Sequence, residues 1–512
     1  MSITKRLIAG SAASWFQIGI TILSQILLVP IYLSRWDVTT YGIWIAIQAL
    51  ISILSTLDLG HQTFLGFEFL RIGQNNKALT SKTLWSGVWL GLIVGTIQVL
   101  LIIGLILSGF FKFLLVDKIE LDQTLVRDAG SVLLLNGIVW MITGSAGGIF
   151  VRVLTAFNYY SRLAWWGVFA SIITALAPAI AVAFGANLLL TGVSAAAATL
   201  FFNLFLYFEI FNLLKKEEIK FDSGSFKLGY QNLLQSLIIS MKNLLENARI
   251  VGVRVILAPL SGAQSLVAFA TIRTGANFAM QGLHSITNPM MPELMKFLHQ
   301  RDQQRSETAF GTIWIVIVAF MAPGVVILQT IIAPLFNMWT RNKIIFDPLL
   351  FAILSISVLI YALSQPAIAV VTGNNLLKSQ LYLSAISAFT MVVIILVLVP
   401  KIGIVGAGLS LLAAEYIAMF GYRREAIKWL NNNGLLWPEN SANLAARSVW
   451  IAAISTAAII YLPSWKWIIL TASLLLMFLN LQKYWFSLPE FARIKSISII
   501  NKTKILRKLI NA

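Results

Sequence analysis

Long apolar runs recur along the whole chain and constrain its fold more than any other feature. A run of about eighteen or more apolar residues is long enough for an α-helix to cross the hydrocarbon core of a bilayer. Roughly fourteen such runs follow one another, with centres near Ile22, Ile51, Val94, Val139, Ile172, Leu200, Leu245, Asn277, Pro323, Ile356, Thr390, Leu411, Ser455 and Leu475. The sequence therefore predicts an all-α polytopic membrane protein. Its 58% hydrophobic and 11% charged residues exclude a soluble globular fold.

The basic residues predict how these spans are oriented. An even number of spans leaves both termini on one side, and cytoplasmic loops are enriched in Lys and Arg. With the termini inside, most of the 38 lysines and arginines fall in inner segments, while the outer segments hold Arg35, Lys112, Lys118, Arg127, Arg341, Lys343, Lys401 and Lys466. We therefore predict that both termini are cytoplasmic. This topology accounts for the net charge of +18 without a nucleic-acid partner.

The loops between the spans leave no room for a catalytic domain. The longest predicted outer loop covers residues 111–128, and the chain contains no phosphate-binding nucleotide loop. With no cysteine and three histidines, neither thiol chemistry nor a metal centre is expected. We expect no enzymatic activity and no organic cofactor, so transport is the function class that remains.

One pair of consecutive spans, between Gly229 and Glu293, carries an unusual concentration of charge. The first span contains Lys242, Glu246, Arg249 and Arg254, and the second contains Arg273. An ionised side chain at bilayer depth costs a few kcal/mol, so it normally faces a protein interior or an aqueous path and marks function. We predict that Lys242, Arg249, Arg254 and Arg273 line a cationic cavity that binds an anion.

A purely structural interpretation of the same charges stays open. At about 100° per residue, Lys242, Glu246 and Arg249 fall within roughly 60° on one helix face, so Glu246 could neutralise both cations and hold the helix in the bundle. Arg254 and Arg273 have no such neighbour within the two spans, although Asp58, Glu209 and Glu415 could serve as distant partners.

Several polar residues extend the predicted site. Asn277, Gln281 and His284 follow Arg273 at helical spacing and suit hydrogen bonds to sugar hydroxyls or to neighbouring helices. Arg152 lies near the cytoplasmic end of the fourth span, where it is either an ordinary inside residue or a first contact for a phosphate.

Short motifs follow one another in a distinctive order and spacing. The first two spans contain Leu27-Leu28-Val29-Pro30-Ile31-Tyr32-Leu33, Thr40-Tyr41-Gly42-Ile43-Trp44 and Leu57-Asp58-Leu59-Gly60. Later come Asn288-Pro289-Met290-Met291-Pro292-Glu293, Val371-Thr372-Gly373-Asn374 and Val399-Pro400-Lys401-Ile402-Gly403-Ile404-Val405-Gly406-Ala407. Together they resemble bacterial polysaccharide (O-antigen type) flippases of the multidrug, oligosaccharidyl-lipid and polysaccharide exporter (MOP) superfamily.

The resemblance implies a domain organisation. It places an N-terminal six-helix lobe at residues 1–228, a pseudo-symmetric C-terminal lobe at 229–430, and two further spans at 431–487. The segment 488–512 alternates Ile and Leu with basic residues, which is typical of an amphipathic helix on the cytoplasmic leaflet or of a solvated tail. In such architectures the substrate binds between the lobes near the midplane, and the lobes rock in alternating access.

The implied function is translocation of an undecaprenyl-pyrophosphate-linked oligosaccharide across the bacterial cytoplasmic (inner) membrane, for O-antigen, capsule or exopolysaccharide synthesis. The implied partners are this lipid-linked substrate, membrane lipids, a polysaccharide polymerase and chain-length machinery. Coupling to H⁺ or Na⁺ would fall on Asp58, Glu246 or Glu415, each of which could equally be a structural partner.

Other functions fit parts of the sequence. A lipid II flippase would have a similar cationic site, whereas a cation-coupled multidrug exporter of organic cations should have an acidic or aromatic one. A membrane scaffold would tolerate neutral residues in the seventh span. A glycosyl polymerase would need acidic or histidine residues on a sizeable outer loop, and this chain offers none.

Overall fold

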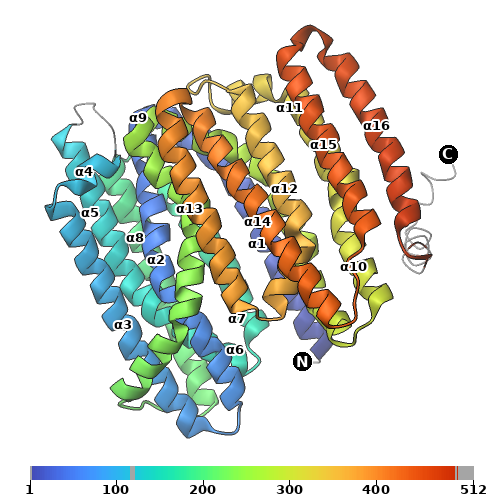
Figure 1. Ribbon diagram of the computed structural model, residues 1–512. Helices are drawn as coiled ribbons and strands as arrows, with labels where there is room; N and C mark the ends of the chain where they lie inside the picture. The colour runs from blue at the N-terminus through green and yellow to red at the C-terminus, as the bar shows by residue number, and fades with distance from the viewer. Residues whose placement is uncertain (1–2, 116–121, 491–492, 494–512) are drawn as a thin grey trace. The chain divides into compact units, whose positions relative to one another are not determined.

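The computed structural model describes residues 3–115, 122–490 and 493, and over these residues the regular structure is helical (Figure 1). Thirteen helices in this part of the chain are long and apolar enough to cross a membrane. The prediction of an all-α polytopic membrane fold is therefore confirmed. The predicted tail at 488–512 lies, apart from its first residues and Arg493, outside the described residues.

The longest helix, α9 (Phe226–His299), is a hairpin of two limbs. Gly262 interrupts it with φ 81° and ψ 170°, a conformation that glycine adopts without steric cost. Arg273 Nη1 donates a hydrogen bond of 2.7 Å to the carbonyl of Ile250. In an unbroken helix these residues would lie about 34 Å apart, so the chain must fold back at Gly262. With its limbs 226–261 and 263–299 counted separately, the membrane-length helices match the predicted spans.

The described chain forms two compact units. The first takes in the chain up to Thr274, Phe336–Phe346 and Ser384–Ser410. It contains most of α13 (Leu377–Ile402) and the first limb of α9, together with α1 (Ile3–Arg35), α2 (Val38–Ile72), α3 (Lys77–Leu107), α4 (Phe110–Leu115), α5 (Gln123–Trp140), the π-helical turn η1 (Met141–Ala146), α6 (Gly147–Ala156), α7 (Tyr160–Ala183) and α8 (Leu188–Lys216).

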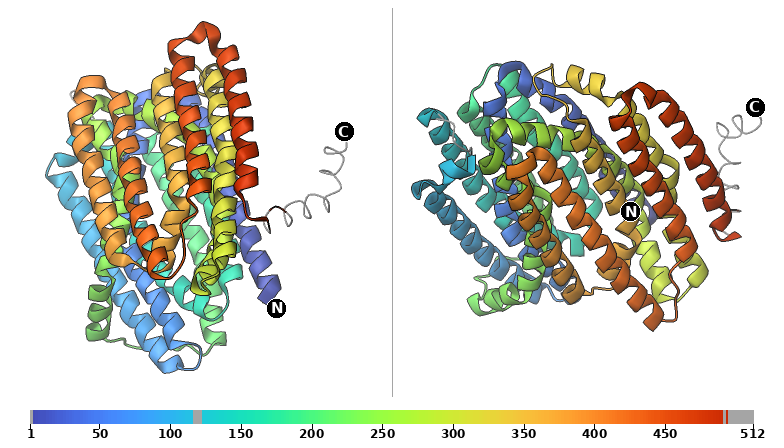
Figure 2. Two further views of the ribbon diagram at one scale, coloured as in Figure 1. Left: turned by 45° about the vertical axis from the view of Figure 1, so that its right-hand side comes forward. Right: turned by 45° about the horizontal axis from the view of Figure 1, so that its top comes forward.

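The second unit takes in Gly275–Leu335, Asp347–Leu383 and the chain from Leu411. It contains the end of α9, α10 (Gln303–Val316), the π-helical turn η2 (Ile317–Met321), most of α11 (Ala322–Trp339), α12 (Pro348–Gly373), most of α14 (Ile404–Asn432), α15 (Glu439–Tyr461), the 3₁₀ turn η3 (Pro463–Trp465) and α16 (Lys466–Ser487). Helices α15 and α16 lie side by side in all views (Figure 2). These units do not coincide with the predicted lobes, which stay a prediction.

Polar residues before the apolar runs begin several helices. The side chain of Asp37 accepts hydrogen bonds from the backbone N–H groups of Thr39 and Thr40, at 3.2 and 3.3 Å, and so caps α2. Asn187 caps α8 in the same way. Such caps satisfy N–H groups that the first helical turn leaves without partners. The short loops thus fix where the spans start.

In the first unit, α2 packs closely against α9. Asn247 Nδ2 on the first limb donates to the carbonyl of Ser52 at 2.7 Å. A Cβ atom at Gly60 would collide with Ser240 on that limb, and one at Gly42 would lie 2.8 Å from Cβ of Ala263, beyond the fold-back. Glycine therefore allows the close approach of the two helices. Along these contacts the residue numbers in α9 fall while those in α2 increase, so α2 and the first limb of α9 are antiparallel.

Aromatic residues fill the core of the second unit. Trp314 and Phe310 of α10 are fully buried and pack against Trp437, with ring centroids 5.4 and 5.6 Å away. Trp314 Nε1 donates to the carbonyl of Leu363 at 3.0 Å, and the Tyr484 hydroxyl donates to the carbonyl of Gly311 at 2.7 Å. Hydrogen bonds from these polar atoms to backbone carbonyls make the burial of such large side chains favourable.

Candidate functional site

Lys242 and Glu246, one helical turn apart on the first limb of α9, form an ion pair. Lys242 Nζ lies 3.6 Å from Glu246 Oε2, and the two side chains are 18% and 32% exposed. Ser384 of α13 donates to Glu246 Oε1 at 3.4 Å. An ion pair of this length with partial exposure is worth at most about 1 kcal/mol. This weak ion pair therefore keeps Glu246 near Lys242 without fixing its position.

The fold-back of α9 brings two of the predicted anion-binding residues to one level. Arg273 on the second limb donates to the carbonyl of Ile250, which directly follows Arg249 on the first limb. Both arginines are 8% exposed. The Arg273 guanidinium also lies 6.0 Å from the centre of the Phe269 ring. One N–H group of Arg273 thus joins the two limbs, a structural role that the sequence did not indicate.

Arg254, nearer the fold-back, lies beside an aromatic cluster that sequence reasoning missed. The side chain is half-buried and its Nε has no hydrogen-bond partner among the described residues. It is in electrostatic range of Tyr41 in α2. Tyr41 stacks on Tyr32 at 5.4 Å, and the buried rings of Trp36 and Trp44 complete the cluster. The close spacing of four large aromatic residues was the available signal.

Asp58 of α2 is the most deeply buried of the candidate carboxylates, at 1% exposure. Gln62 Nε2 donates to its Oδ2 at 2.9 Å, and Trp140 Nε1 donates to its Oδ1 at 3.3 Å. Ser145 and Gln98, both buried, lie beside the same carboxyl group. These neighbours are all neutral. The structure therefore gives Asp58 hydrogen-bond donors as partners and none of the α9 cations.

A π-helical turn, η1, lies beside Asp58 and its hydrogen-bond donors. It begins directly after Trp140 and includes Ser145, and the Tyr207 hydroxyl donates to the carbonyl of Ile142 within it at 2.5 Å. Gln62 also donates to the Gly144 carbonyl at 3.2 Å. Single π-helical turns inside α-helices occur frequently at functional sites. Side chains thus satisfy the carbonyls that the turn displaces.

The remaining predicted site residues are found on α6, α8, the second limb of α9 and α14. Glu209 forms an ion pair with Arg162, so it is not a partner of the α9 cations. Arg152 is exposed on α6 beside Gly66. The second unit contains Glu415, which is half-buried on α14, and Asn277, Gln281 and His284, which are half-buried on the second limb of α9. The His284 ring lies 6.0 Å from that of Tyr361.

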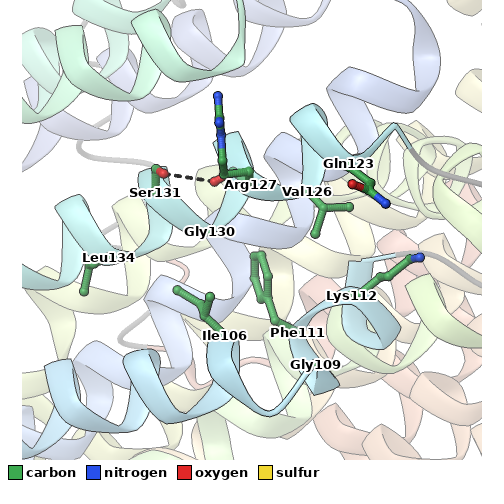
Figure 3. Close-up of a pocket in the computed structure, with 10 residues that line it drawn as sticks. All are labelled: Ile106, Gly109, Phe111, Lys112, Gln123, Val126, Arg127, Gly130, Ser131 and Leu134. Atoms are coloured by element: carbon green, nitrogen blue, oxygen red, sulfur yellow. Dashed lines mark hydrogen bonds between the residues drawn. The ribbon is translucent and has the colours of Figure 1, made fainter.

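A pocket of about 410 Å³ lies between α3, α4 and α5, and none of the predicted site residues lines it (Figure 3). Ile106 and Phe111 form its apolar side, and the Arg127 side chain points away from them. Lys112 and Arg127 are both exposed, as charged residues at the end of a span usually are. We therefore assign this pocket no ligand. Across the described part of the chain, no three His, Asp or Glu side chains gather as a metal site.

Comparison with known proteins identifies the fold. No family model and no curated protein matches the sequence. Among solved structures, the lipid II flippase MurJ in its inward closed conformation has a TM-score of 0.60 and 13% identity, over 92% of this chain and 98% of that one. An inward-facing multidrug resistance MATE transporter of the MOP superfamily gives 0.58 and 13%, over 81% and 98%.

A further solved structure, a MOP superfamily transporter from Pyrococcus furiosus, has a TM-score of 0.55 and 14% identity, over 83% of this chain and 95% of that one. That transporter is described as having a binding pocket of reverse polarity. At these identities the likeness concerns the fold and not the substrate. The chain therefore has the fold of the MOP superfamily transporters, shared by MATE proteins and the lipid II flippase.

Proposed function

We propose that this protein is a flippase that carries an undecaprenyl-pyrophosphate-linked oligosaccharide across the bacterial cytoplasmic membrane, by alternating access of two lobes. The observation that carries the proposal is the α9 hairpin, which brings Arg273 to the level of Arg249. Two guanidinium groups from the two limbs suit a pyrophosphate, because each presents a planar fork of donors to phosphate oxygens.

The other candidate residues receive roles consistent with this substrate. Lys242 and Arg254 add positive charge along the same hairpin, and Arg152 meets the phosphate on its way in. Asn277, Gln281 and His284 donate and accept hydrogen bonds with sugar hydroxyls. The protein would then lower the barrier to crossing by neutralising and solvating the head group, while the prenyl tail stays in an apolar environment.

Coupling to an ion gradient is assigned to Asp58, with Glu246 and Glu415 as secondary candidates. A carboxylate held by neutral donors needs a single positive charge, from H⁺ or Na⁺, to become neutral. Gain or loss of that charge would change the hydrogen bonds that Gln62 and Trp140 make across α2 and α5. Such a change is a means of biasing one transport state over the other.

A second candidate function is transport of lipid II itself. The specific observation in its favour is the likeness to MurJ over 92% of this chain. Both substrates carry a prenyl pyrophosphate, so the α9 cations suit either. Export of organic cations, by contrast, is disfavoured by the excess of basic over acidic residues in the hairpin.

Deletion of the gene tests the proposed function in cells. We expect lipid-linked oligosaccharide to accumulate on the cytoplasmic face of the membrane while surface polysaccharide is lost and peptidoglycan synthesis continues. Arrest of peptidoglycan synthesis with accumulation of lipid II would instead establish the second candidate. Normal amounts of both lipid intermediates would contradict both proposals. Accessibility of tags at the two ends would test the cytoplasmic termini.

A further inference from the structure

An apolar groove of about 470 Å³ runs through the second unit, and none of the predicted α9 cations lines it. The second limb of α9, the segment α10–η2–α11 and α12 form its walls. Leu283, Val325, Leu328 and Phe351 are among its lining side chains, and Ser355 supplies the single hydroxyl group among them. Its volume is within the range of about 300–1,000 Å³ that small-molecule sites usually have.

Three glycines open this groove. A Cβ atom added at Gly282 or Gly324 would meet nothing within 4 Å, and one at Gly275 would meet only the Phe351 ring, at 3.8 Å. None of the three has the positive φ that favours glycine. Glycine inside a helix lowers helix stability relative to alanine. Unlike Gly42 and Gly60, these glycines are explained neither by helix contact nor by backbone geometry, and each leaves room in the groove.

A π-helical turn forms the facing wall. The turn η2 ends two residues before Pro323 and three before Gly324, and it places Phe320 and Met321 next to each other on the groove. Phe320 is 71% exposed, whereas Met321 is 5% exposed. The groove thus has an open side at Phe320 and a closed floor at Met321. Turns of this kind are frequent at functional sites.

The second limb of α9 has an apolar face and a polar face. At about 100° per residue, Gly275, Ala279 and Gly282 fall on one face of the helix, and Asn277, Gln281 and His284 fall on the opposite face. The apolar face lines the groove. A helix with an apolar groove on one side and hydrogen-bonding groups on the other matches a substrate with a long hydrocarbon tail and a polar head.

We propose that this groove binds the polyprenyl tail of the transported lipid. The inference rests on the proposed function, because the tail is that of the lipid-linked substrate. Water is disfavoured in an apolar cavity within membrane-length helices, whereas a hydrocarbon chain gains dispersion contacts with the groove walls. The tail remains in the groove while the head group crosses the membrane on the polar side of the same limb.

Filling the groove tests this proposal. At Gly282→Leu and Gly324→Leu the new Cβ atom meets nothing within 4 Å, so the added side chain takes up space in the groove. The matched controls are Gly104→Leu in α3 and Gly167→Leu in α7, where a Cβ atom also meets nothing within 4 Å. Loss of two buried methylene contacts corresponds to about tenfold in affinity. We expect about tenfold weaker transport of the long-tailed substrate in proteoliposomes for the groove variants, and wild-type transport for the controls.

Two further readouts separate the possible outcomes. A substrate analogue with a truncated prenyl chain should be transported equally by wild-type and groove variants, and a photoreactive group on the long tail should label Phe320 or Leu328. Equal transport of the long-tailed substrate by groove and control variants would overturn the tail site, as would labelling of Phe320 by photoreactive phospholipid but not by the prenyl probe. Absence of lipid-linked oligosaccharide transport by wild-type protein would instead contradict the proposed function, on which the tail site rests.

Discussion

Asp58 and Glu246 are both carboxylates in membrane-length helices, yet their surroundings differ. Asp58 is 1% exposed and accepts hydrogen bonds from the neutral Gln62 and Trp140. Glu246 is 32% exposed and lies 3.6 Å from Lys242. A buried carboxylate without a cation responds to addition of one positive charge, whereas a partly exposed ion pair can exchange its carboxylate for another anion. Under the proposed function, Asp58 is therefore the candidate for ion coupling and the α9 hairpin is the candidate for substrate binding.

The largest effect is expected from Arg273→Ala. This change removes a charged donor from the predicted pyrophosphate site and the 2.7 Å bond to Ile250. Because hydrogen bonds of charged groups contribute about 1.5–3 kcal/mol each, transport should fall about a hundredfold or more. Arg249→Ala should behave alike at normal membrane levels. In Arg273→Lys the ammonium group can still donate a hydrogen bond to the Ile250 carbonyl, but it lacks the planar set of donors of a guanidinium group. This variant therefore distinguishes loss of the contact between the limbs from loss of phosphate binding.

Asp58→Asn should abolish stimulation by an ion gradient. The amide has the shape of the carboxyl group but cannot take up a positive charge, so transport should become independent of imposed H⁺ and Na⁺ gradients. Substrate binding, measured by lipid competition, should remain within about twofold. Trp140→Phe removes one donor and serves as the milder companion. Unchanged gradient dependence in Asp58→Asn would move coupling to Glu246 or Glu415.

Glu246→Gln distinguishes the two interpretations of the hairpin. If Glu246 competes with the substrate for Lys242, its neutralisation should strengthen binding of inorganic pyrophosphate or of the lipid-linked substrate by about threefold to fivefold. A structural carboxylate would instead show unchanged binding and a lower melting temperature in detergent. The Lys242→Ala variant provides the reference, because it removes the same ion pair from the other side.

The smallest effect is expected from Lys242→Arg. The substitution keeps the positive charge beside Glu246 at half-buried depth, so transport should change by no more than about threefold. Loss of transport as severe as in Arg273→Ala would show that Lys242 fills a site of fixed shape. The transport rate of purified, reconstituted protein is the measurement.

The sequence predicted the spans well because each is a local property of the chain. Hydropathy located the membrane-length helices, and helical periodicity placed Lys242 and Glu246 one turn apart. The partners of Asp58 were missed: Gln62 lies one helical turn away but was not considered, and Gln98, Trp140 and Ser145 are distant in sequence. Periodicity defines the faces of a helix but not which other helix covers each face.

The fold-back of α9 illustrates the same limit. The two spans were predicted, and Pro259, Ser261 and Gly262 lie where the chain reverses, but hydropathy does not tell which residues of the two limbs meet. The bond between Arg273 and Ile250 follows only once both limbs are packed. The groove beside η2 likewise forms between three separate segments of the chain. Its glycines follow no sequence pattern that would indicate a groove.

The most direct test of the central claim is the movement of a labelled undecaprenyl-pyrophosphate oligosaccharide across proteoliposomes. We predict that wild-type protein makes the label on the inner leaflet accessible to an external sugar-modifying enzyme. The double variant Arg249→Ala, Arg273→Ala should do so no faster than protein-free vesicles. Equal transport by the wild type and this double variant would contradict the assignment of the α9 hairpin as the pyrophosphate site. Absence of transport by folded wild-type protein under imposed H⁺ and Na⁺ gradients would contradict the flippase itself.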